Sequence, residues 1–266
     1  MSLSRRQGMF SSSVIARNGC RAVILLLSLT CSASAAASEQ AQSNVVCRKQ
    51  LSVQLQDNLA RRLREITGWP DLKFDSNGAL QVGAGEPVGG SKSARDLVAK
   101  LIHGQDFIAI EEANNRPDVV FGRLVSARWE QGSADKPRAH IVLMDSADFK
   151  HVMGDKRGLD AFNVGWVLLH EFDHVATDSD DAAARGEIGE CEDHINQMRR
   201  ECHLPQRADY FFTPFPLSPD SDFPTRFVRL SFFEDDANKN KRRYWLIWDA
   251  KLVGGLEEIK QIAALR

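Results

Sequence analysis

Cysteine is scarce in this chain of 266 residues, which contains only five cysteines. Cys20 and Cys31 lie in an N-terminal segment with the features of a targeting signal, so three remain in the rest of the chain. An odd number of cysteines argues against a disulfide-stapled scaffold. Cys191 and Cys202 fall about three turns apart on one predicted helix and cannot pair with each other. Cys47 could pair with either, or all three can be free and buried as small hydrophobic side chains.

The chain also lacks a basic face and a long apolar run. Residues 1–37 contain four of the 34 Lys and Arg and none of the 36 Asp and Glu, so the remaining chain has a net charge near −6. A mildly acidic chain without a basic cluster does not favour a nucleic-acid partner. The apolar run 22–29 is shorter than the roughly 20 residues that span a bilayer, so no stable membrane anchor is predicted.

Residues 1–37 have the composition of a secretory signal peptide. Arginine supplies all of their charge, the apolar run follows, and the small-residue tract 31–38 offers cleavage sites after Ala35 or Ala37. We therefore predict that residues 38–266 form the mature protein, exported to the periplasm or secreted. A chain of that length can bury a substantial core in one domain.

The most specific signal in the chain is the stretch HEFDH at residues 170–174. Apolar residues surround it on every side between residues 164 and 175, which predicts a buried helix. Histidines four residues apart on a helix project from one face, so His170 and His174 can reach a single metal ion. Glu171 points partly aside, where it can hold a metal-bound water. This is the H-E-x-x-H arrangement of zinc peptidases.

The alternative interpretation of this helix is a buried element whose polar side chains are satisfied by neighbouring groups, as buried polar groups normally are. Three or four ionisable side chains on an otherwise apolar helix would nevertheless be costly without strong partners. One metal ion offers a partner for most of them. The pattern therefore predicts Zn²⁺ as the cofactor.

Hydrophobic periodicity predicts an α+β fold in which a small sheet precedes the H-E-x-x-H helix, and a second helix and a hairpin follow it. Trp245 and Trp248 lie on the predicted hairpin, where they could line a cleft or pack in the core. The predicted elements are helices over residues 45–67 and 93–101, strands over 106–111, 118–129 and 139–144, helices over 163–177 and 181–202, and hairpin strands over 225–234 and 242–249.

A catalytic zinc ion needs a third protein ligand and one open position. The predicted helix 181–202 carries an apolar stripe that is typical of core packing, and acidic residues flank this stripe. Glu187 lies nearest the stripe on a helical wheel, Glu192 lies on its other flank, and Glu190 lies farther round. Geometry alone therefore favours Glu187.

Two further candidates for the third ligand remain. Asp180 lies six residues after the second histidine, where metzincin-type zincins place their third ligand, but Thr177 replaces the glycine that those families carry three residues after that histidine. His194 could bind the metal or donate a hydrogen bond to a ligand. Three other acidic residues are expected to end the helix and to orient its histidines: Asp173, Asp178 and Asp181.

The segment 189–210 resembles a segment found downstream of H-E-x-x-H in bacterial gluzincin-like proteins, which include effector metallopeptidases and toxin-associated zinc peptidase domains. The matching positions are Gly189, Glu190, Asn196, Arg199, Arg200, Glu201, Leu204, Pro205, Arg207 and Tyr210. The segment departs from the pattern at Met198, Cys202 and His203, where aliphatic residues and glycine are commoner. The resemblance covers about residues 163–210, under a fifth of the chain, and implies that Glu190 is the third zinc ligand.

The order of sheet and helix also resembles the N-terminal lobe of zincin metallopeptidases, in which a mixed sheet lies over the H-E-x-x-H helix. In that family the edge strand of the sheet pairs with the backbone of the substrate. Strand 139–144, which is the strand next in sequence to the helix, is the predicted edge strand.

These features together predict an exported zinc metallopeptidase that hydrolyses a peptide or protein substrate. His170, His174 and Glu190 would bind the metal. Glu171 would act as general base and then as general acid, taking a proton from the attacking water and passing it to the leaving amine.

Tyr210 or His203, which follow the second helix closely, would donate a hydrogen bond to the tetrahedral oxyanion. The alternative function is a non-catalytic binding or structural protein of the cell envelope, whose metal is structural or absent. A glutamate directly after a metal-binding histidine has no structural role, which favours the enzyme.

Overall fold

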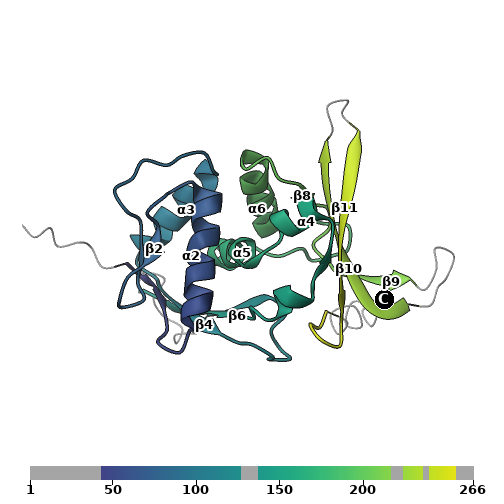
Figure 1. Ribbon diagram of the computed structural model, residues 1–266, viewed down its shortest axis with the longest axis horizontal. Helices are drawn as coiled ribbons and strands as arrows, with labels where there is room; N and C mark the ends of the chain where they lie inside the picture. Colours follow the sequence, from purple (N-terminus) through teal and green to yellow (C-terminus); the bar gives the residue numbers. More distant parts are fainter. Residues whose placement is uncertain (1–42, 127–136, 217–223, 236–239, 256–266) are drawn as a thin grey trace, which may run out of the picture. The chain divides into compact units, whose positions relative to one another are not determined.

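The computed structural model of the chain describes residues 43–126, 137–216, 224–235 and 240–255. The chain divides into a unit of residues 1–41 and a unit of residues 42–266, and the described residues all belong to the second (Figure 1). The predicted signal peptide, residues 1–37, lies outside the described residues. Within the described ranges, no helix is both long and apolar enough to cross a membrane.

Helices and strands are both present in the second unit, which confirms the predicted α+β class. The helices are α2 (Val53–Thr67), α3 (Lys92–Ile102), the short 3₁₀ helix η1 (Asp148–His151), α4 (Lys156–Ala161), α5 (Val164–Thr177) and α6 (Glu190–Glu201). The strands are β1 (Val45–Cys47), β2 (Lys73–Phe74), β3 (Leu80–Gln81), β4 (Phe107–Glu112), β5 (Gly122–Ser126), β6 (Ala139–Met144), β7 (Met153–Gly154), β8 (Gln206–Arg207), β9 (Thr213–Pro216), β10 (Pro224–Asp235) and β11 (Lys241–Asp249).

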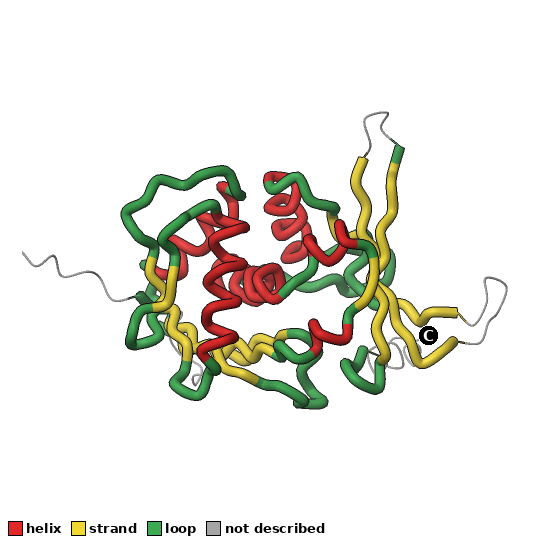
Figure 2. Tube along the Cα trace, in the orientation of Figure 1, coloured by secondary structure: helices red, strands yellow, loops and turns green. Residues whose placement is uncertain are grey.

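The first sheet has the strand order β1-β4-β6-β5. Strands are drawn in yellow in Figure 2. Strands β1, β4 and β6 run parallel, and β5 is antiparallel to β6. Because β6 has partners on both sides, the prediction that strand 139–144 is the edge strand is wrong. Strand β6 follows β5 in the sequence and lies between β4 and β5, and among the strands of the described part of the chain β5 pairs with β6 alone. Proximity in sequence to α5 therefore did not determine the edge.

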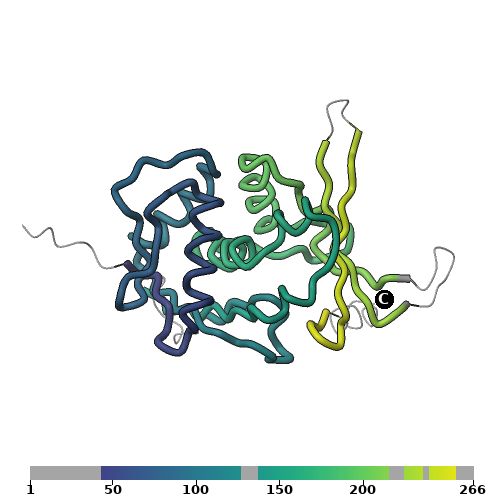
Figure 3. Tube along the Cα trace, in the orientation of Figure 1, coloured from purple at the N-terminus to yellow at the C-terminus, as the bar shows by residue number. Residues whose placement is uncertain are grey.

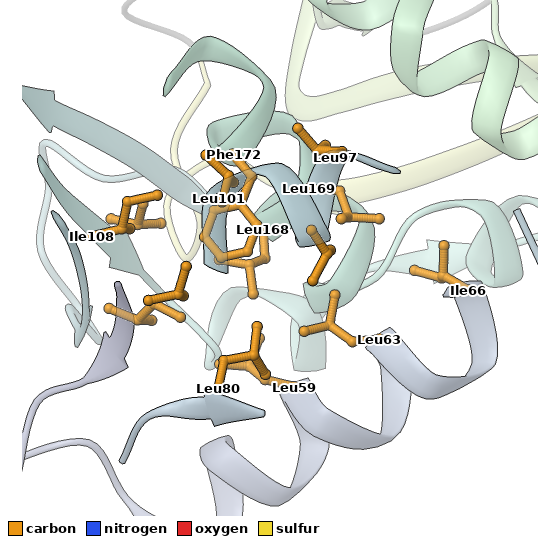
Figure 4. Packing of buried hydrophobic residues seen from close by; sticks show 14 of the residues in the cluster. Leu59, Leu63, Ile66, Leu80, Leu97, Leu101, Ile108, Leu168, Leu169 and Phe172 are labelled. Atoms are coloured by element: carbon orange, nitrogen blue, oxygen red, sulfur yellow. The ribbon is translucent and has the colours of Figure 1, made fainter. Parts of the chain in front are cut away.

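Helices α2, α3, α5 and α6 pack together beside this sheet to form the larger core (Figure 3). Helix α5 contacts α2, α3 and α6, as well as β5 and β6. Its apolar residues on every side are explained by this burial, as the sequence predicted. Full burial of one such side chain contributes roughly 1.5–3 kcal/mol. Figure 4 shows the side chains that meet in this core, among them Leu59 and Leu63 of α2, Leu97 and Leu101 of α3, and Leu168, Leu169 and Phe172 of α5.

A second sheet contains the predicted hairpin. Its strand order is β7-β11-β10-β8, and β9 also pairs with β10. Trp248 of β11 is fully buried and contacts the ring of Phe121 edge to face, with 5.1 Å between ring centroids. It is therefore a core residue. Trp245 is only partly buried, and the Arg229 guanidinium lies 4.4 Å from its ring centroid.

Two helices begin later than the sequence predicts. Residues 45–47 of the predicted helix 45–67 form β1, and α2 begins at Val53. Residues 181–189 of the predicted helix 181–202 form a loop, and α6 begins at Glu190. Gly189 has φ of +78°, and a Cβ atom there would lie 2.4 Å from the backbone nitrogen of Ala182. Only glycine fits this position without strain, so the helix cannot extend backwards through it.

The three cysteines within the described ranges are all free. Cys47 and Cys191 are buried, and Cys202 is half-buried. Of the two alternatives left by the sequence, free thiols are therefore correct. Cys191 lies beside the two histidines of α5, whereas the other two cysteines lie elsewhere.

Candidate metal centre

Helix α5 presents the two histidines of HEFDH on one face. Its N-cap is Asn163, whose side chain accepts a hydrogen bond from the Gly165 backbone N–H at 3.0 Å. A cap of this kind contributes about 1 kcal/mol. The side chains of His170 and His174 are only 12% and 16% exposed, and their Nε2 atoms lie 3.3 Å apart. Two potential metal ligands are therefore held together by the most deeply buried helix of the fold.

Asp181 completes a triangle of ligand atoms with these histidines. Its Oδ1 lies 3.1 Å from Nε2 of His170 and 3.3 Å from Nε2 of His174. Ligand atoms of one tetrahedral zinc ion, bound at the usual distances, are separated by roughly 3.3–3.6 Å. The three atoms of the triangle therefore have close to the mutual separation expected for three corners of one tetrahedron.

The loop between α5 and α6 places Asp181 in this position. Helix α5 ends at Thr177, and its C-cap is Asp178, whose φ of 57° lies in the left-handed region and turns the chain back. The carbonyl oxygen of Asp180 accepts a hydrogen bond from the Cys191 backbone N–H, and Asp181 forms a β-bridge with Gly189. The start of α6 therefore holds the loop at both of these points.

Hydrogen bonds at Nδ1 determine how the imidazoles face the triangle. Nδ1 of His174 lies 2.7 Å from the Ser179 carbonyl oxygen, which can only accept, so Nδ1 carries the proton. Nδ1 of His170 lies 3.2 Å from Oε2 of Glu192 and 3.3 Å from Sγ of Cys191. With both protons at Nδ1, the two Nε2 lone pairs face each other and the Asp181 carboxylate. Such an arrangement calls for a cation between them.

Without a metal ion, protons on the histidines supply the positive charge between these atoms. Burial lowers the pKa of His174, but hydrogen bonding to the Asp181 carboxylate outweighs burial and raises the pKa to about 11. The same opposing effects raise the pKa of His170 well above its ordinary value. Burial raises the pKa of Asp181, but the two histidines outweigh it and hold that pKa far below its usual range. The triangle therefore favours positive charge at its centre.

A buried ionic network supports the His170 side of the triangle. The Glu192 side chain is 1% exposed and contacts two guanidinium groups, Arg199 Nη1 at Oε1 and Arg207 Nη1 at Oε2, the latter at 3.1 Å. Burial raises the pKa of Glu192, but the charges of the two arginines outweigh it and hold the pKa well below the usual range. Glu192 therefore stays ionised and can accept a hydrogen bond from His170 Nδ1.

The residues that carry the sequence resemblance belong to this same network. The side-chain amide of Asn196 donates to the Arg207 carbonyl oxygen at 3.0 Å and accepts from the Arg207 backbone N–H at 2.7 Å. Arg199 donates to Oδ1 of Asn196, and Arg207 Nη2 donates to the carbonyl oxygen of Tyr210. Asn196, Arg199, Arg207 and Tyr210 therefore connect α6 to the segment that follows it.

Glu171 lies on the sheet side of α5. It is 7% exposed, and burial raises the pKa of its carboxyl group, opposed by the charges of the two histidines. A Cβ atom on Gly122 of β5 would lie 3.4 Å from Oε1 of Glu171 and 2.5 Å from Cγ1 of Val167. Glycine therefore allows β5 to approach α5 closely beside this carboxylate.

Tyr210 contacts two of the three residues of the triangle, His170 and Asp181. Its ring stacks on the His170 imidazole, with 6.0 Å between centroids and 22° between planes, and its hydroxyl is hydrogen-bonded to Asp181. Burial raises the pKa of Tyr210, so the hydroxyl remains a donor. A cavity of about 110 Å³ reaches these groups, and its walls include Gly122, Trp166, His170, Glu171, Tyr210 and Phe212.

The structure thus brings together four predicted site residues, His170, Glu171, His174 and Tyr210. It does not bring Glu190 to them. Glu190 is the exposed first residue of α6, and the ligand group found among the described residues is His170, His174, Asp181 and Cys191, with one ligand atom from each within 4.8 Å of the others. The prediction of Glu190 followed the resemblance, whereas the preference of the helical wheel for Glu187 assumed a helix through residues 181–189, where the chain instead forms a loop.

The other candidates also lie outside the triangle. Glu187 is exposed, and its carboxylate accepts a hydrogen bond from the Ala184 backbone N–H. Asp180 is exposed and contributes its carbonyl oxygen to α6. His194 Nδ1 lies 2.8 Å from Oδ2 of the buried Asp173, so this histidine contacts a carboxylate on α5 rather than a ligand atom. His203 is exposed.

Sequence reasoning missed the roles of three residues. Asp181 was expected to orient a histidine, Cys191 was assigned to core packing, and Glu192 was noted only as flanking the apolar stripe. The signal for Asp181 was weak, because three of the four residues 178–181 are aspartates. Which of them faces the histidines depends on the turn at Asp178.

No protein-family model, curated protein or solved structure matches this chain. The function is therefore inferred from the arrangement of the side chains.

Proposed function

We propose that this chain is a zinc-dependent metallopeptidase in which His170, His174 and Asp181 bind the metal. The observation that carries this proposal is the triangle of two Nε2 atoms and one carboxylate oxygen, separated by 3.1–3.3 Å. The helix that supplies both histidines also presents Glu171. Asp181 takes the place that the resemblance assigned to Glu190. The remaining residues of H-E-x-x-H keep the roles that the sequence suggested.

The donor set fits zinc. Imidazole nitrogens and a carboxylate oxygen are ordinary zinc ligands, and three protein ligands with one open position are typical of catalytic rather than structural sites. Both histidines have an acceptor at Nδ1, as metal-binding histidines almost always do. When bound, zinc would polarise the scissile carbonyl and lower the pKa of a water molecule to about 7.

Glu171 would move the proton during hydrolysis. Its carboxylate would accept a proton from the attacking water and pass it to the nitrogen of the leaving amine. Burial raises its pKa, which moves the group towards the range in which it can both accept and release a proton. Glycine at position 122 places no side-chain atoms between β5 and this carboxylate.

Tyr210 would stabilise the oxyanion that forms at the scissile carbonyl. Its hydroxyl stays protonated and already lies beside a proposed ligand, Asp181. A donor held in place before the reaction stabilises developing negative charge without reorganisation. His203, the other predicted donor, is exposed.

A zincin-like lobe is the finer fold that we propose. The support is a mixed sheet whose antiparallel edge strand, β5, contacts the H-E-x-x-H helix. An extended peptide could add to the outer edge of residues 122–126 through backbone hydrogen bonds, which would bring its carbonyl groups to Glu171. The substrate would then be a peptide or an unfolded protein segment, and the signal-like residues 1–37 suggest that it lies outside the cytoplasm.

One observation favours a second candidate, a non-catalytic protein with a structural metal. Cys191 belongs to the same group of ligand atoms as the triangle. A cysteine thiolate as fourth ligand would close the coordination sphere, and closed tetrahedral sites are typical of structural zinc.

Zinc content and peptide hydrolysis, measured on wild-type protein and on Glu171→Gln, test the proposal. We expect about one zinc per chain in both proteins, and a loss of turnover of at least about 100-fold in the variant, because it loses a base and not a ligand. Glu187→Gln, at an exposed acid of the neighbouring loop, is the matched control and should keep both properties. Wild-type protein without stoichiometric zinc would contradict the proposal. Zinc together with equal hydrolysis in wild type and Glu171→Gln would remove Glu171 from the mechanism.

A further inference from the structure

We propose that Arg207 is a positioning residue that holds two of the three metal ligands in place, one through Glu192 and the other through Tyr210. This inference rests on the proposed metal site of His170, His174 and Asp181. Arg207 touches none of the three ligands itself. Its guanidinium instead contacts one group on each side of the triangle.

The contacts of Arg207 use all three guanidinium nitrogens. Nη1 donates to Oε2 of Glu192 at 3.1 Å, Nε donates to the carbonyl oxygen of Asp209 at 3.1 Å, and Nη2 donates to the carbonyl oxygen of Tyr210. The guanidinium carbon also lies 5.0 Å from the centroid of the Tyr210 ring. A planar fork with five N–H donors can make this set of contacts, whereas a lysine ammonium, which is a point charge, cannot.

Arg207 supports His170 through the Glu192 carboxylate. The Glu192 oxygen that accepts from Arg207 is the same Oε2 that lies 3.2 Å from His170 Nδ1. A carboxylate at Nδ1 holds the ring in one orientation and makes Nε2 a better ligand. The hydrogen bond from Arg207 limits the rotation of this carboxylate, so a change at Arg207 is transmitted to the imidazole.

Arg207 supports Asp181 through Tyr210. Arg207 fixes the backbone and the ring of Tyr210, and the Tyr210 hydroxyl is hydrogen-bonded to the Asp181 carboxylate. The Tyr210 ring also stacks on His170. Through these contacts, one guanidinium controls both the oxygen ligand and one of the nitrogen ligands.

Hydrogen bonds hold the backbone of Arg207 in place, so its side chain starts from a fixed position. The side-chain amide of Asn196 on α6 bonds both its N–H and its C=O, and β8 pairs Arg207 with Phe232 of β10. The second sheet is therefore tied to the metal centre at this residue. The arrangement also explains why the segment 189–210 carries Asn196, Arg207 and Tyr210 together.

Cobalt(II) binding to Arg207→Lys tests this inference, because the visible absorption of bound cobalt reports the geometry of its ligands and does not require activity. We expect the variant to bind Co²⁺ about 10–100-fold more weakly than the wild type, the range typical of outer-shell partners, and with an altered visible spectrum. Arg200→Lys is the matched control. Arg200 lies on α6 and is exposed, with its guanidinium on Gln197 and Gln206, so neither affinity nor spectrum should change.

A second variant keeps the inference testable if Arg207→Lys does not fold. Tyr210→Phe keeps the ring stacked on His170 and removes only the hydroxyl on Asp181, so it should also shift the cobalt spectrum. A wild-type protein that binds Co²⁺ while Arg207→Lys shows the same affinity and spectrum would overturn the inference and leave the proposed function intact. Wild-type protein that binds no Co²⁺ or Zn²⁺ would instead overturn the proposed function, and the inference with it.

Discussion

Replacing Glu192 by glutamine should destabilise the fold strongly, although the two side chains have nearly the same shape. Both carboxylate oxygens of Glu192 face donors: Arg199 at Oε1, and Arg207 and His170 at Oε2. A glutamine side chain replaces one oxygen by an NH₂ group. Whichever way the amide is turned, that group places a donor against a guanidinium donor, and two buried cations lose their counter-charge.

The size of the effect follows from the burial of the three charges. Glu192 and Arg199 are almost fully buried, and Arg207 is 8% exposed. Removing one partner of a buried ion pair typically costs about 3–5 kcal/mol, because the charge left behind is neither solvated nor paired. For a protein of this size, such a loss lowers the melting temperature by roughly 6–20 °C. It is a large part of a total stability of about 5–15 kcal/mol.

Urea unfolding of the metal-free proteins, followed by circular dichroism, measures this loss without a contribution from zinc. Glu190→Gln is the control, because Glu190 lies two residues away on the same helix and is exposed. We expect a change of less than about 0.5 kcal/mol for the control. A loss below about 1 kcal/mol for Glu192→Gln would refute the reasoning. Loss of zinc binding in Glu190→Gln would restore Glu190 as a ligand and refute the assignment of Asp181.

Three further predictions concern the loop after α5 and the link between α3 and α6. Asp181→Asn should lose bound zinc while Asp180→Asn keeps it, as measured by elemental analysis; equal zinc in both variants would contradict the assignment. Gly189→Ala should lower the free energy of unfolding by at least about 1–2 kcal/mol, because φ is +78° there; a melting temperature equal to that of the wild type would exclude this strain. Glu201 accepts hydrogen bonds from Ser93, and its pKa is lowered from 4.5 to about 2, where burial is outweighed by these bonds. The stabilising contribution of the Glu201 carboxylate is therefore complete above about pH 4.5 and is lost as the pH falls towards 2. Glu201→Gln should reduce the slope of the unfolding free energy against pH in that window. An unchanged slope would contradict this prediction.

Local patterns in the sequence were sufficient for the elements that they describe. The apolar residues on every side of 164–175 predicted a buried helix, because a side chain at each angle of the helix must find a core. The alternation in 225–234 and 242–249 predicted the hairpin, since side chains on a strand alternate between its two faces. The four-residue spacing of His170 and His174 was sufficient to place both imidazoles on one face.

Tertiary structure alone decided which further groups meet those imidazoles. Asp181 reaches them because the chain turns at Asp178 in the left-handed region and because Gly189 lets the loop return against α6. A helical wheel cannot represent such a turn, so it ranked Glu187 and Glu190 by a helix that does not exist over residues 181–189.

The edge strand and the ionic network depended on the tertiary structure for a related reason. Which strand is outermost depends on where β5 pairs, and no local pattern in residues 139–144 records this. Glu192 and Arg207 are fifteen residues apart and belong to different elements, yet they lie within 3.1 Å of each other. The sequence by itself determined the two histidines and Glu171, because one helix sets their spacing. The fold determined which further groups meet the imidazoles, because these groups come from a loop and from segments that only packing brings together.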